Sequence, residues 1–511
     1  MPTHHTRAFI SSTLALLLLL LSSASGPVAA QKAARKKTAR PAPTSRTREA
    51  AEGWRKSPPR PASIRPFRLP ERRESRLDNN LLLVLIEDRR SPMVTVQLGI
   101  PVGSANDPEG EPGLAEATAQ LLTEGAGDRS AEQLARETET IGGRISASAG
   151  DDYTTVSASV ISENAGRLLE LFGDVVLRPT FPESELEHYR NNRIQVLTVQ
   201  RQEPAFLVGE QFNRIIYGAH PYALSSPTPE SVAAMTRAGI ERFYRSGYTP
   251  DGSALVIVGD FNAAKVEAQA REIFGGWRAP EARARSLPEI AGHTARRIYL
   301  IDRPGSEQAD FRIGNLAVSH SDPDYFPLLV ANAVLGDGAS SRLFLNIREQ
   351  KGYAYDVSSA LNAPLRQGTF YGMASSRTEV AVPAVKEMLA EFERMRGEEV
   401  PEADLQNAKN YLNGIFSLVL STQGGIAGQV AQIHMLGLSR DYLETFRARV
   451  EAVTPRQVME ATRKYITADR AAIVVVGDAS KLRRQLETVA PVEVFDIGGK
   501  KKPGAGNATR D

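Results

Sequence analysis

Short runs of hydrophobic residues recur along the chain, and two of them are nearly identical. The runs "ALVIVGDFN" (254–262) and "AIVVVGDAS" (472–480) lie 218 residues apart, and each predicts a buried strand that ends in Gly-Asp. The segments "PTFPESELEHYRNN" (179–192) and "EEVPEADLQNAKNY" (398–411) lie 219 residues apart, and each predicts a helix that begins with Pro-Glu-x-x-Leu. In both places a strand and then a helix are predicted just before that segment. The repeated order indicates two homologous units.

Each unit alternates predicted strands and helices, which indicates an α+β fold. Runs such as "TTVSASV" alternate polar and apolar residues, as expected for an antiparallel sheet with one covered face. We place the N-terminal unit at 76–277 and the C-terminal unit at 298–490. Residues 278–297 are rich in Pro, Ala and Arg without periodicity and predict an interdomain linker, and residues 491–511 predict a polar tail.

The segment "GLAEATAQLLTEG" (113–125) predicts an amphipathic helix. Its polar residues Glu116 and Gln120 lie four positions apart, so they share one face of the helix. This is the spacing at which two side chains can hold one metal ion, but neither of these residues is a histidine.

The N-terminus has the pattern of a secretory signal peptide. Arg7 precedes a run of leucines, and the small residues Val28 and Ala30 mark a cleavage site after Ala30. The alternative is an uncleaved anchor helix, but the apolar run is short for a membrane span. We therefore expect residues 1–30 to be removed and the mature protein to be exported, in the periplasm or outside the cell, with no transmembrane segment.

Composition narrows the function classes further. Residues 31–75 hold 14 Lys and Arg but only 4 Asp and Glu, with recurring prolines, and predict a basic disordered linker. Residues 76–511 hold 47 basic and 56 acidic side chains, so bulk charge gives nucleic-acid binding no support. The chain has no cysteine, which excludes disulfides, thiolate nucleophiles and iron–sulfur clusters.

Several stretches together resemble the pitrilysin/insulinase family of zinc peptidases, in its two-domain bacterial and mitochondrial-processing-peptidase form. The resemblance covers about 77 to 489 and is carried by "LDNNLLLVLIEDRRSPMVTVQLGIPVGSANDPEGEPGLAE", "FPESELEHYRNNRIQVL", "YGAHPYALSSPTPESVAAMT", "GDGASSRLFLNIREQKGYAYDVSS" and the paired "VGD" strands. It implies that each unit is an antiparallel sheet backed by helices. It also implies that the two units form a half shell, and that two half shells close around an unfolded peptide.

The resemblance also implies where the catalytic zinc would be bound. In active members the helix after "GLA" reads His-x-x-Glu-His, with two histidine ligands and a general-base glutamate between them. Those positions are Glu116, Ala119 and Gln120 here, and the third ligand falls at about Val196. The five histidines after the predicted signal peptide offer no displaced pair, because none lies within four residues of another: His188, His220, His293, His320 and His434. We therefore expect no zinc and no hydrolysis by this chain alone, with zinc only in a partner subunit, and a structural loop role for His220.

The C-terminal unit offers a different contribution. In the family an Arg and a Tyr of this segment reach across to the substrate at the zinc, and some bacterial members divide the zinc motif and this pair between two subunits. Arg348 and Tyr355 are the candidates here, with Tyr353 as the alternative tyrosine. By spacing the long-chain members' tyrosine is Tyr353 and their arginine falls on Asn346, so the pairing stays open. In the structural alternative, Arg348 pairs with Glu349 or Asp356 and Tyr355 lies in the core.

A peptide-binding strand is the remaining family feature. The stretch "GGRISASAGDDYTTVSA" (142–158) resembles the edge strand to which an extended peptide adds by backbone hydrogen bonds. Active members tend to have Asn-Ala there, whereas this chain has Ser146 and Ala147. The alternative is an ordinary sheet edge.

We therefore predict a non-catalytic subunit of an exported, heteromeric metalloendopeptidase. Its partner is a homologous subunit with an intact His-x-x-Glu-His motif, and its substrates are extended or unfolded peptides. One alternative is a pseudo-peptidase that serves only as a structural or peptide-binding component. Another is a standalone enzyme with unorthodox chemistry, for which no Ser/His/Asp arrangement stands out.

Overall fold

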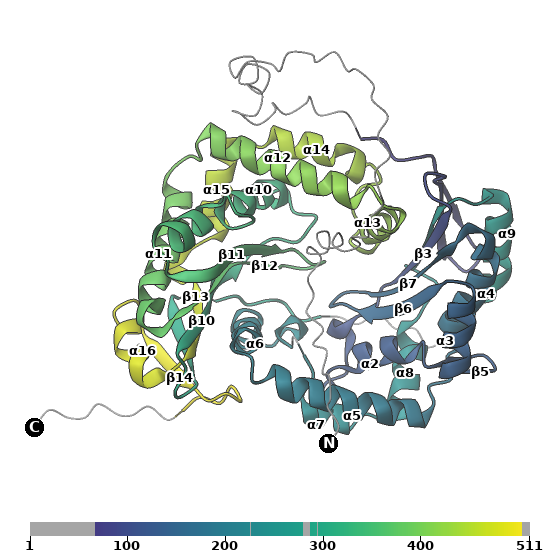
Figure 1. The fold of residues 1–511 in the computed structure, drawn as a ribbon, viewed down its shortest axis with the longest axis horizontal. Coiled ribbons are helices and arrows are strands. Elements are labelled where there is room, and N and C mark those ends of the chain that lie inside the picture. The colour runs from purple at the N-terminus through teal and green to yellow at the C-terminus, as the bar shows by residue number, and fades with distance from the viewer. Residues whose placement is uncertain (1–66, 225, 280–286, 294, 503–511) are drawn as a thin grey trace, which may run out of the picture. The chain divides into compact units, whose positions relative to one another are not determined.

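In this computed structural model, which describes residues 67–502 except 225, 280–286 and 294, two six-stranded sheets carry the fold (Figure 1). The first sheet has the strand order β1-β2-β8-β3-β7-β6. Its strands are β1 (Arg72–Arg76), β2 (Leu82–Glu87), β3 (Met93–Ile100), β6 (Arg144–Ala149), β7 (Thr154–Ile161) and β8 (Ala254–Gly259). A separate two-stranded sheet pairs β4 (Gly125–Ala126) with β5 (Arg129–Ser130).

Helices of the N-terminal unit follow the predicted alternation. They are α2 (Leu114–Leu121), α3 (Ala131–Thr140), α4 (Ala165–Leu177), α5 (Glu183–Gln200), α6 (Pro204–Tyr217), α7 (Pro229–Ala233), α8 (Arg237–Gly247) and α9 (Ala263–Phe274). The predicted helix at 113–125 is α2, which ends at Leu121.

The second sheet repeats the first. Its order is β11-β12-β10-β13-β9-β14, so β9, β10, β11, β12 and β13 hold the places of β2, β3, β6, β7 and β8. The strands are β9 (Arg297–Asp302), β10 (Gln308–Leu316), β11 (Ala354–Asn362), β12 (Thr369–Arg377), β13 (Ala472–Gly477) and β14 (Val492–Phe495). The helical segments are α10 (Tyr325–Leu335), the π-helical turn η5 (Phe344–Gln350), α11 (Thr378–Gly397), α12 (Glu402–Val419), α13 (Gln423–Met435), α14 (Tyr442–Ala452), α15 (Pro455–Tyr465) and α16 (Ala479–Leu486).

The two predicted α+β units with helix-backed sheets are confirmed, and the strand directions add a detail. Most neighbouring strands are antiparallel, but β2 and β8 are parallel, as are β9 and its neighbours β13 and β14. The strands β8 and β13 are the two hydrophobic runs that the sequence repeats. Every residue of both strands is buried, which explains why these runs are apolar throughout.

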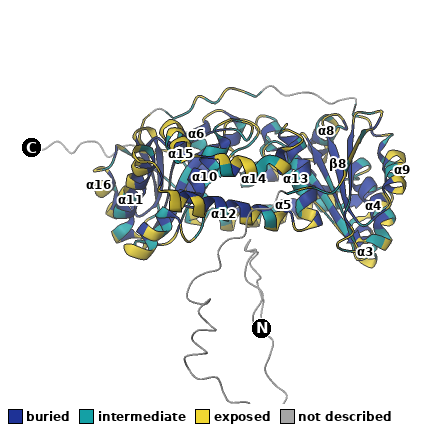
Figure 2. Cartoon of the chain, turned by 90° about the horizontal axis from the view of Figure 1, so that it is seen from above, coloured by how far each residue is buried: buried dark blue, intermediate teal, exposed yellow. Residues whose placement is uncertain are grey.

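Each sheet is covered on one face by a helix from the other unit. Helix α6 packs against β10 and β13, and its Leu207 and Phe212 share a buried cluster with Val474. Helix α13 packs against β3 and β8, and its Val430 shares a cluster with Val256. Figure 1 shows α6 beside β10 and α13 beside β3. Figure 2 shows that β8 lies in the buried interior while the outer surfaces of α9 and α16 are exposed. The two units therefore share their cores.

The predicted bounds of the basic linker (31–75) and of the polar tail (491–511) are wrong, because each segment contributes a strand. The last residues of the predicted linker form β1, which pairs with β2 although its sequence is Arg-Arg-Glu-Ser-Arg. An edge strand tolerates charged residues, and here Arg72 is buried against Glu74 at 2.8 Å. The start of the predicted tail forms β14, whose Phe495 packs against Tyr299. The predicted signal peptide, residues 31–66, part of the interdomain linker and residues 503–511 lie outside the described residues.

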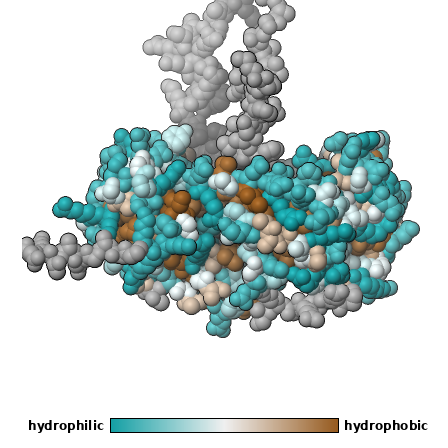
Figure 3. All heavy atoms as spheres, turned by 90° about the horizontal axis from the view of Figure 1, so that it is seen from below, coloured by the Kyte–Doolittle hydropathy of each residue, from teal (hydrophilic) through white to brown (hydrophobic). Residues whose placement is uncertain are grey.

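Figure 3 shows one face that is largely hydrophilic, with apolar side chains gathered in its middle part. Across the described part of the chain, every helix is too short or too polar to span a lipid bilayer.

Candidate functional site

Helix α2 is fixed at its start by a side chain that precedes it. The Asp107 carboxylate accepts hydrogen bonds from the backbone N–H groups of Gly113 at 2.6 Å and Ala115 at 2.7 Å. These bonds satisfy amide groups that have no partner inside the helix. Gly113 has a φ of 91°, and a Cβ there would lie 2.6 Å from Pro227, so only glycine fits. The helix therefore begins at Leu114 and presents Glu116 and Gln120 on one face.

Glu116 is bound by an arginine from another helix. Arg193 of α5 donates from Nη2 to Glu116 Oε2 at 3.0 Å, and its Nε lies 2.9 Å from Glu116 Oε1. Both side chains are largely buried, with 16% and 28% exposed. Gln120 Nε2 also reaches Glu116 Oε1 at 3.4 Å. Burial raises the pKa of Glu116, and the adjacent guanidinium opposes that shift.

A pocket of about 400 Å³ lies beside this ion pair, between α2 and α5. Glu116, Gln120, Arg193 and Val196 line it, together with Leu121, Glu124, Glu185, His188, Tyr189 and Asn192. Ala119, at the predicted general-base position, is fully buried and lies outside this lining. The structure thus brings Glu116, Gln120 and Val196 together, as the resemblance implies.

These side chains do not fit a zinc ion. Ala119 and Val196 offer no donor atom, and the Glu116 carboxylate is already held by Arg193. A zinc site in a peptidase needs three protein ligands, usually His and carboxylate. Elsewhere in the described ranges, no three His, Asp or Glu side chains gather closely enough to hold a metal ion.

Arg193 is the functional-site residue that sequence reasoning missed. It lies three positions before Val196, so both residues share the face of α5 that lines the pocket. That spacing was available as a signal. What the sequence did not reveal is that the guanidinium meets Glu116, which lies 77 residues earlier.

Arg348 lies between two aromatic rings in the C-terminal unit. Its guanidinium carbon is 4.6 Å from the ring centre of Phe344 and 4.8 Å from that of Tyr355. Its Nε is 3.6 Å from Glu349 Oε1, so the alternative pairing of Arg348 with Glu349 is present as a weak contact. Tyr355 is 82% exposed, so the core alternative for this tyrosine is wrong.

Tyr353 and Asn346 face inward instead. Tyr353 is half-buried and packs against the core of the C-terminal unit. Asn346 is buried, and its amide donates to Glu391 at 2.6 Å and to Glu387 at 3.3 Å. Asn346 stands where the long-chain members have their arginine. It is buried, and it donates hydrogen bonds to two glutamates of this unit. In this segment Arg348, which is half-buried, contacts the exposed Tyr355.

Ser146 and Ala147 lie on β6, which is an edge strand of the first sheet in the described residues. Ser146 is exposed and pairs in register with Ser157, while Ala147 packs against the core opposite Val156. One backbone edge of β6 is thus open to an added strand.

The predicted residues form separate groups. Arg348 contacts Phe344, Glu349 and Tyr355, all from its own segment, and none of these lines the pocket beside Glu116. His220 is buried, and its Nδ1 accepts a hydrogen bond from the Tyr222 N–H at 3.2 Å, which agrees with the structural loop role.

The fold and this site define a peptidase-like chain of two homologous units without the metal ligands of the corresponding enzymes. The chain belongs to the insulinase family of peptidases. The family description "Insulinase (Peptidase family M16)" matches residues 82–230, and "Peptidase M16 inactive domain" matches residues 234–412.

Relatives and solved structures agree with this assignment. The chain is 25% identical to an uncharacterized zinc protease of Bacillus subtilis, covering 78% of this chain and 96% of that protein. It is 28% identical to an uncharacterized zinc protease of Mycobacterium leprae, covering 78% and 90%. A structure of a peptidase M16 inactive domain from Pseudomonas fluorescens aligns with a TM-score of 0.75 and 27% identity, over 80% of this chain and 98% of that one. A protease structure from Helicobacter pylori shares the fold, with a TM-score of 0.74 at 20% identity over 80% and 100%.

Proposed function

We propose that this chain is the zinc-less subunit of an exported, heteromeric metalloendopeptidase, working in the periplasm or outside the cell. One observation carries the proposal. Arg193 of α5 holds Glu116, which stands at the position of a zinc ligand in active members, while Tyr355 is exposed on the other unit with the half-buried Arg348 beside it. The zinc-ligand position of this chain is thus taken up by an ion pair, whereas Tyr355 with Arg348 offers hydrogen-bond donors for a substrate held by a partner.

The pair of Arg348 and Tyr355 has the chemistry for a contribution to a partner's site. A guanidinium and a phenol both donate hydrogen bonds to the oxygen of a substrate carbonyl, and more strongly as that oxygen becomes negative. Stacking between Phe344 and Tyr355 fixes the direction of the Arg348 side chain. A partner that holds zinc through an intact His-x-x-Glu-His motif supplies the attacking water in this proposal.

The open edge of β6 supports extended peptides as substrates. Backbone hydrogen bonds to an added strand are nearly independent of the peptide's side chains. Ser146 and alternate residues of β6 are exposed on one face of the sheet, so their side chains are accessible beside an added strand.

The test is reconstitution with a homologous subunit that carries the intact zinc motif. We expect neither purified chain alone to cleave an unfolded peptide, and the mixture to cleave it in a chelator-sensitive way. Arg348→Ala in this chain is expected to lower kcat by about 10²–10³-fold, the loss typical of one removed oxyanion donor. Tyr355→Phe and Tyr353→Phe, measured in parallel, decide which tyrosine contributes.

Arg456→Ala is the matched control, because Arg456 is an exposed arginine that pairs with Glu460 on α15. It should leave the reconstituted activity unchanged. If the Arg348→Ala and Tyr355→Phe chains support the partner fully, the contributed-residue proposal fails. Stable assembly without any gain in proteolysis would favour the alternative, a structural or peptide-binding component.

A further inference from the structure

A second pocket lies in the C-terminal unit, away from both groups of residues described above. It has a volume of about 530 Å³ and opens between the start of α10, the turn after α13, and α14. Its apolar lining comes mainly from Phe326, Pro327, Leu438, Tyr442 and Val453. It shares no lining residue with the pocket beside Glu116. Its size falls within the roughly 300–1,000 Å³ of small-molecule sites.

The aromatic walls of this pocket are held in place by one another. His320 stacks on Tyr325 with ring centres 4.0 Å apart, and its Nε2 is 2.8 Å from the Tyr442 hydroxyl. Phe326 packs against Tyr442 at 5.9 Å and Phe446 at 5.6 Å. Burial lowers the pKa of His320 to about 4, so this ring is neutral near pH 7 and adds no charge to the pocket.

Arg449 supplies the positive charge. Its guanidinium carbon lies 5.6 Å from the Phe326 ring centre and 5.8 Å from that of Tyr442. Its one hydrogen bond with a described residue is a long one, from Nη2 to the Ser439 hydroxyl at 3.5 Å, and no acidic side chain of the described ranges lies within 4 Å. An arginine on an aromatic wall without a carboxylate partner can donate a bidentate pair of hydrogen bonds to a ligand carboxylate.

The acidic residue of the pocket is engaged elsewhere. Asp322 Oδ1 accepts the backbone N–H of Asp324 at 2.8 Å, just before α10 begins at Tyr325. The positive end of the helix dipole lies next to this carboxylate and offsets its charge. The positive charge of Arg449 is therefore left without a negative partner among the residues that line this pocket.

We propose that this pocket binds a carboxylate that carries an aromatic or apolar group, with Arg449 on the carboxylate and the faces of Phe326 and Tyr442 against the apolar group. The same chemistry comes from two sources, a free aromatic acid or the C-terminal residue of a peptide. The proposal is independent of any zinc-bearing partner, because all of its residues belong to one unit of this chain.

The test is binding of N-acetyl-L-phenylalanine to the full chain, measured by calorimetry and by ligand-observed NMR, with N-acetyl-L-phenylalaninamide as the uncharged comparison. We expect the acid to bind at least about tenfold more tightly than the amide, the difference typical of one charge-assisted hydrogen bond. Arg449→Gln should remove that preference. Ser439→Trp, at an exposed position of the rim, should block both compounds by filling the pocket.

Arg456→Gln is the matched control, because this exposed arginine of α15 lies outside the pocket. It should bind the acid like the unaltered chain. Circular dichroism shows whether each variant is folded. Comparison of 3-phenylpropionate with acetyl-Ala-Ala-Phe distinguishes the two sources, since the tighter ligand identifies the one that the pocket prefers. Equal binding of acid and amide, undiminished binding by Arg449→Gln, or no saturable binding at millimolar concentration would each overturn the proposal.

Discussion

Glu116 keeps a cation beside it, although that cation is a guanidinium rather than a metal ion. Arg193 reaches it from α5, the helix that carries the third zinc ligand in active members of the family. Two short contacts in a largely buried position make this pair more than a surface ion pair. Removal of one partner leaves the other charge poorly solvated, which is the costly way to break such a pair.

We predict that Arg193→Met destabilises the protein by about 1–3 kcal/mol near pH 7, because Glu116 loses its charged partner while staying buried. The pKa of Glu116, already raised by burial, should rise further. Adding Glu116→Gln to the Arg193→Met variant should recover part of the loss. Urea unfolding of the four chains of this double-mutant cycle measures the coupling.

The pair Arg237 and Glu241 on α8, with side chains 49% and 33% exposed, is the less buried control. Breaking it should change the free energy of unfolding by no more than about 0.5 kcal/mol. An equally small effect of Arg193→Met would mean that the ion pair between α2 and α5 does not hold the two helices together.

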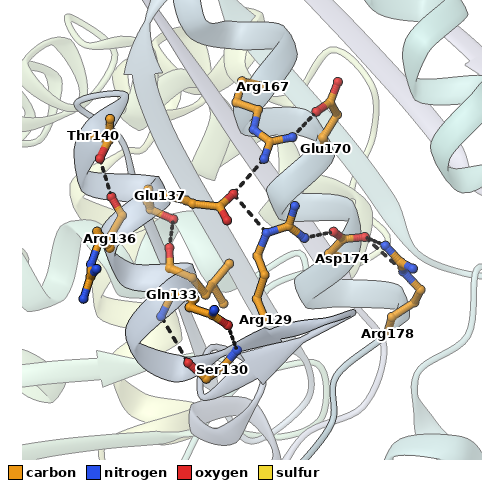
Figure 4. A network of polar contacts seen from close by, with 12 residues as sticks. Arg129, Ser130, Gln133, Arg136, Glu137, Thr140, Arg167, Glu170, Asp174 and Arg178 are labelled. Carbon is orange, nitrogen blue, oxygen red and sulfur yellow. Dashed lines mark hydrogen bonds and ion pairs between the residues drawn. The ribbon is translucent and has the colours of Figure 1, made fainter.

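At the scale of elements, a network of charges joins β5, α3 and α4 (Figure 4). Arg129 Nε lies 3.0 Å from Glu137 Oε2, and its Nη1 lies 2.7 Å from Asp174 Oδ2. Arg167 adds a second contact to Glu137 at 2.7 Å. Ser130 caps the start of α3, and its hydroxyl accepts the Gln133 N–H. The network therefore fixes the C-terminal part of α3 against α4, at the opposite end of α3 from this cap.

This network gives a pH prediction through Glu137. Its hydrogen bond with Arg129, above all, lowers the pKa of the Glu137 carboxyl in the folded protein. A lowered folded pKa stabilises the protein above the unfolded pKa of about 4.3, and the contribution disappears as pH falls through the folded value. We expect the stability of Glu137→Gln to fall less steeply between neutral pH and about pH 3 than that of the unaltered chain.

Urea unfolding across that pH range measures the two slopes. Glu132→Gln is the control, because Glu132 pairs with Arg136 within α3 and takes no part in the contacts to α4. Identical pH dependence of the Glu137→Gln variant and the unaltered chain would show that Glu137 is not held by the network in solution.

Elements could be predicted where local pattern decides them. The all-apolar β8 and β13, the capped helices and the alternating β7 follow from composition and spacing alone. The strand β1 could not, because its residues are charged and its stability comes from backbone pairing with β2. The strand β14 is short, and its Phe495 acquires a partner only when Tyr299 is placed beside it.

At the scale of the whole molecule, the internal repeat predicted two units but not their exchange of helices. Helices α6 and α13 hold equivalent places in the repeat, and each covers the sheet of the opposite unit. Nothing in a local pattern tells an apolar helix face which sheet it will cover. The same limit applies to Arg193 and to the pocket at Arg449, which both depend on residues far apart in the sequence.

We predict that neither unit folds normally when it is produced alone, for example as 67–279 or 287–502. The first would expose Leu207 and Phe212 of α6, and the second would expose Val430 of α13. Binding of a hydrophobic dye and loss of cooperative unfolding should report this exposure.

Co-expression of the two fragments should restore a 1:1 complex with the dye binding of the intact chain. Cooperative unfolding of either isolated fragment, at a midpoint close to that of the whole chain, would contradict the shared-core account.

The crossed helices also decide where movement can take place. Swinging one sheet away from the other would strip α6 from β13 and α13 from β8, and so bring both shared clusters into water. Such an opening has a large free-energy cost. We therefore expect the two sheets to move together as one rigid body. In the proposed assembly, a peptide must therefore enter between this chain and its partner. The movement that admits it takes place at the contact between the two subunits and not between the two units of this chain.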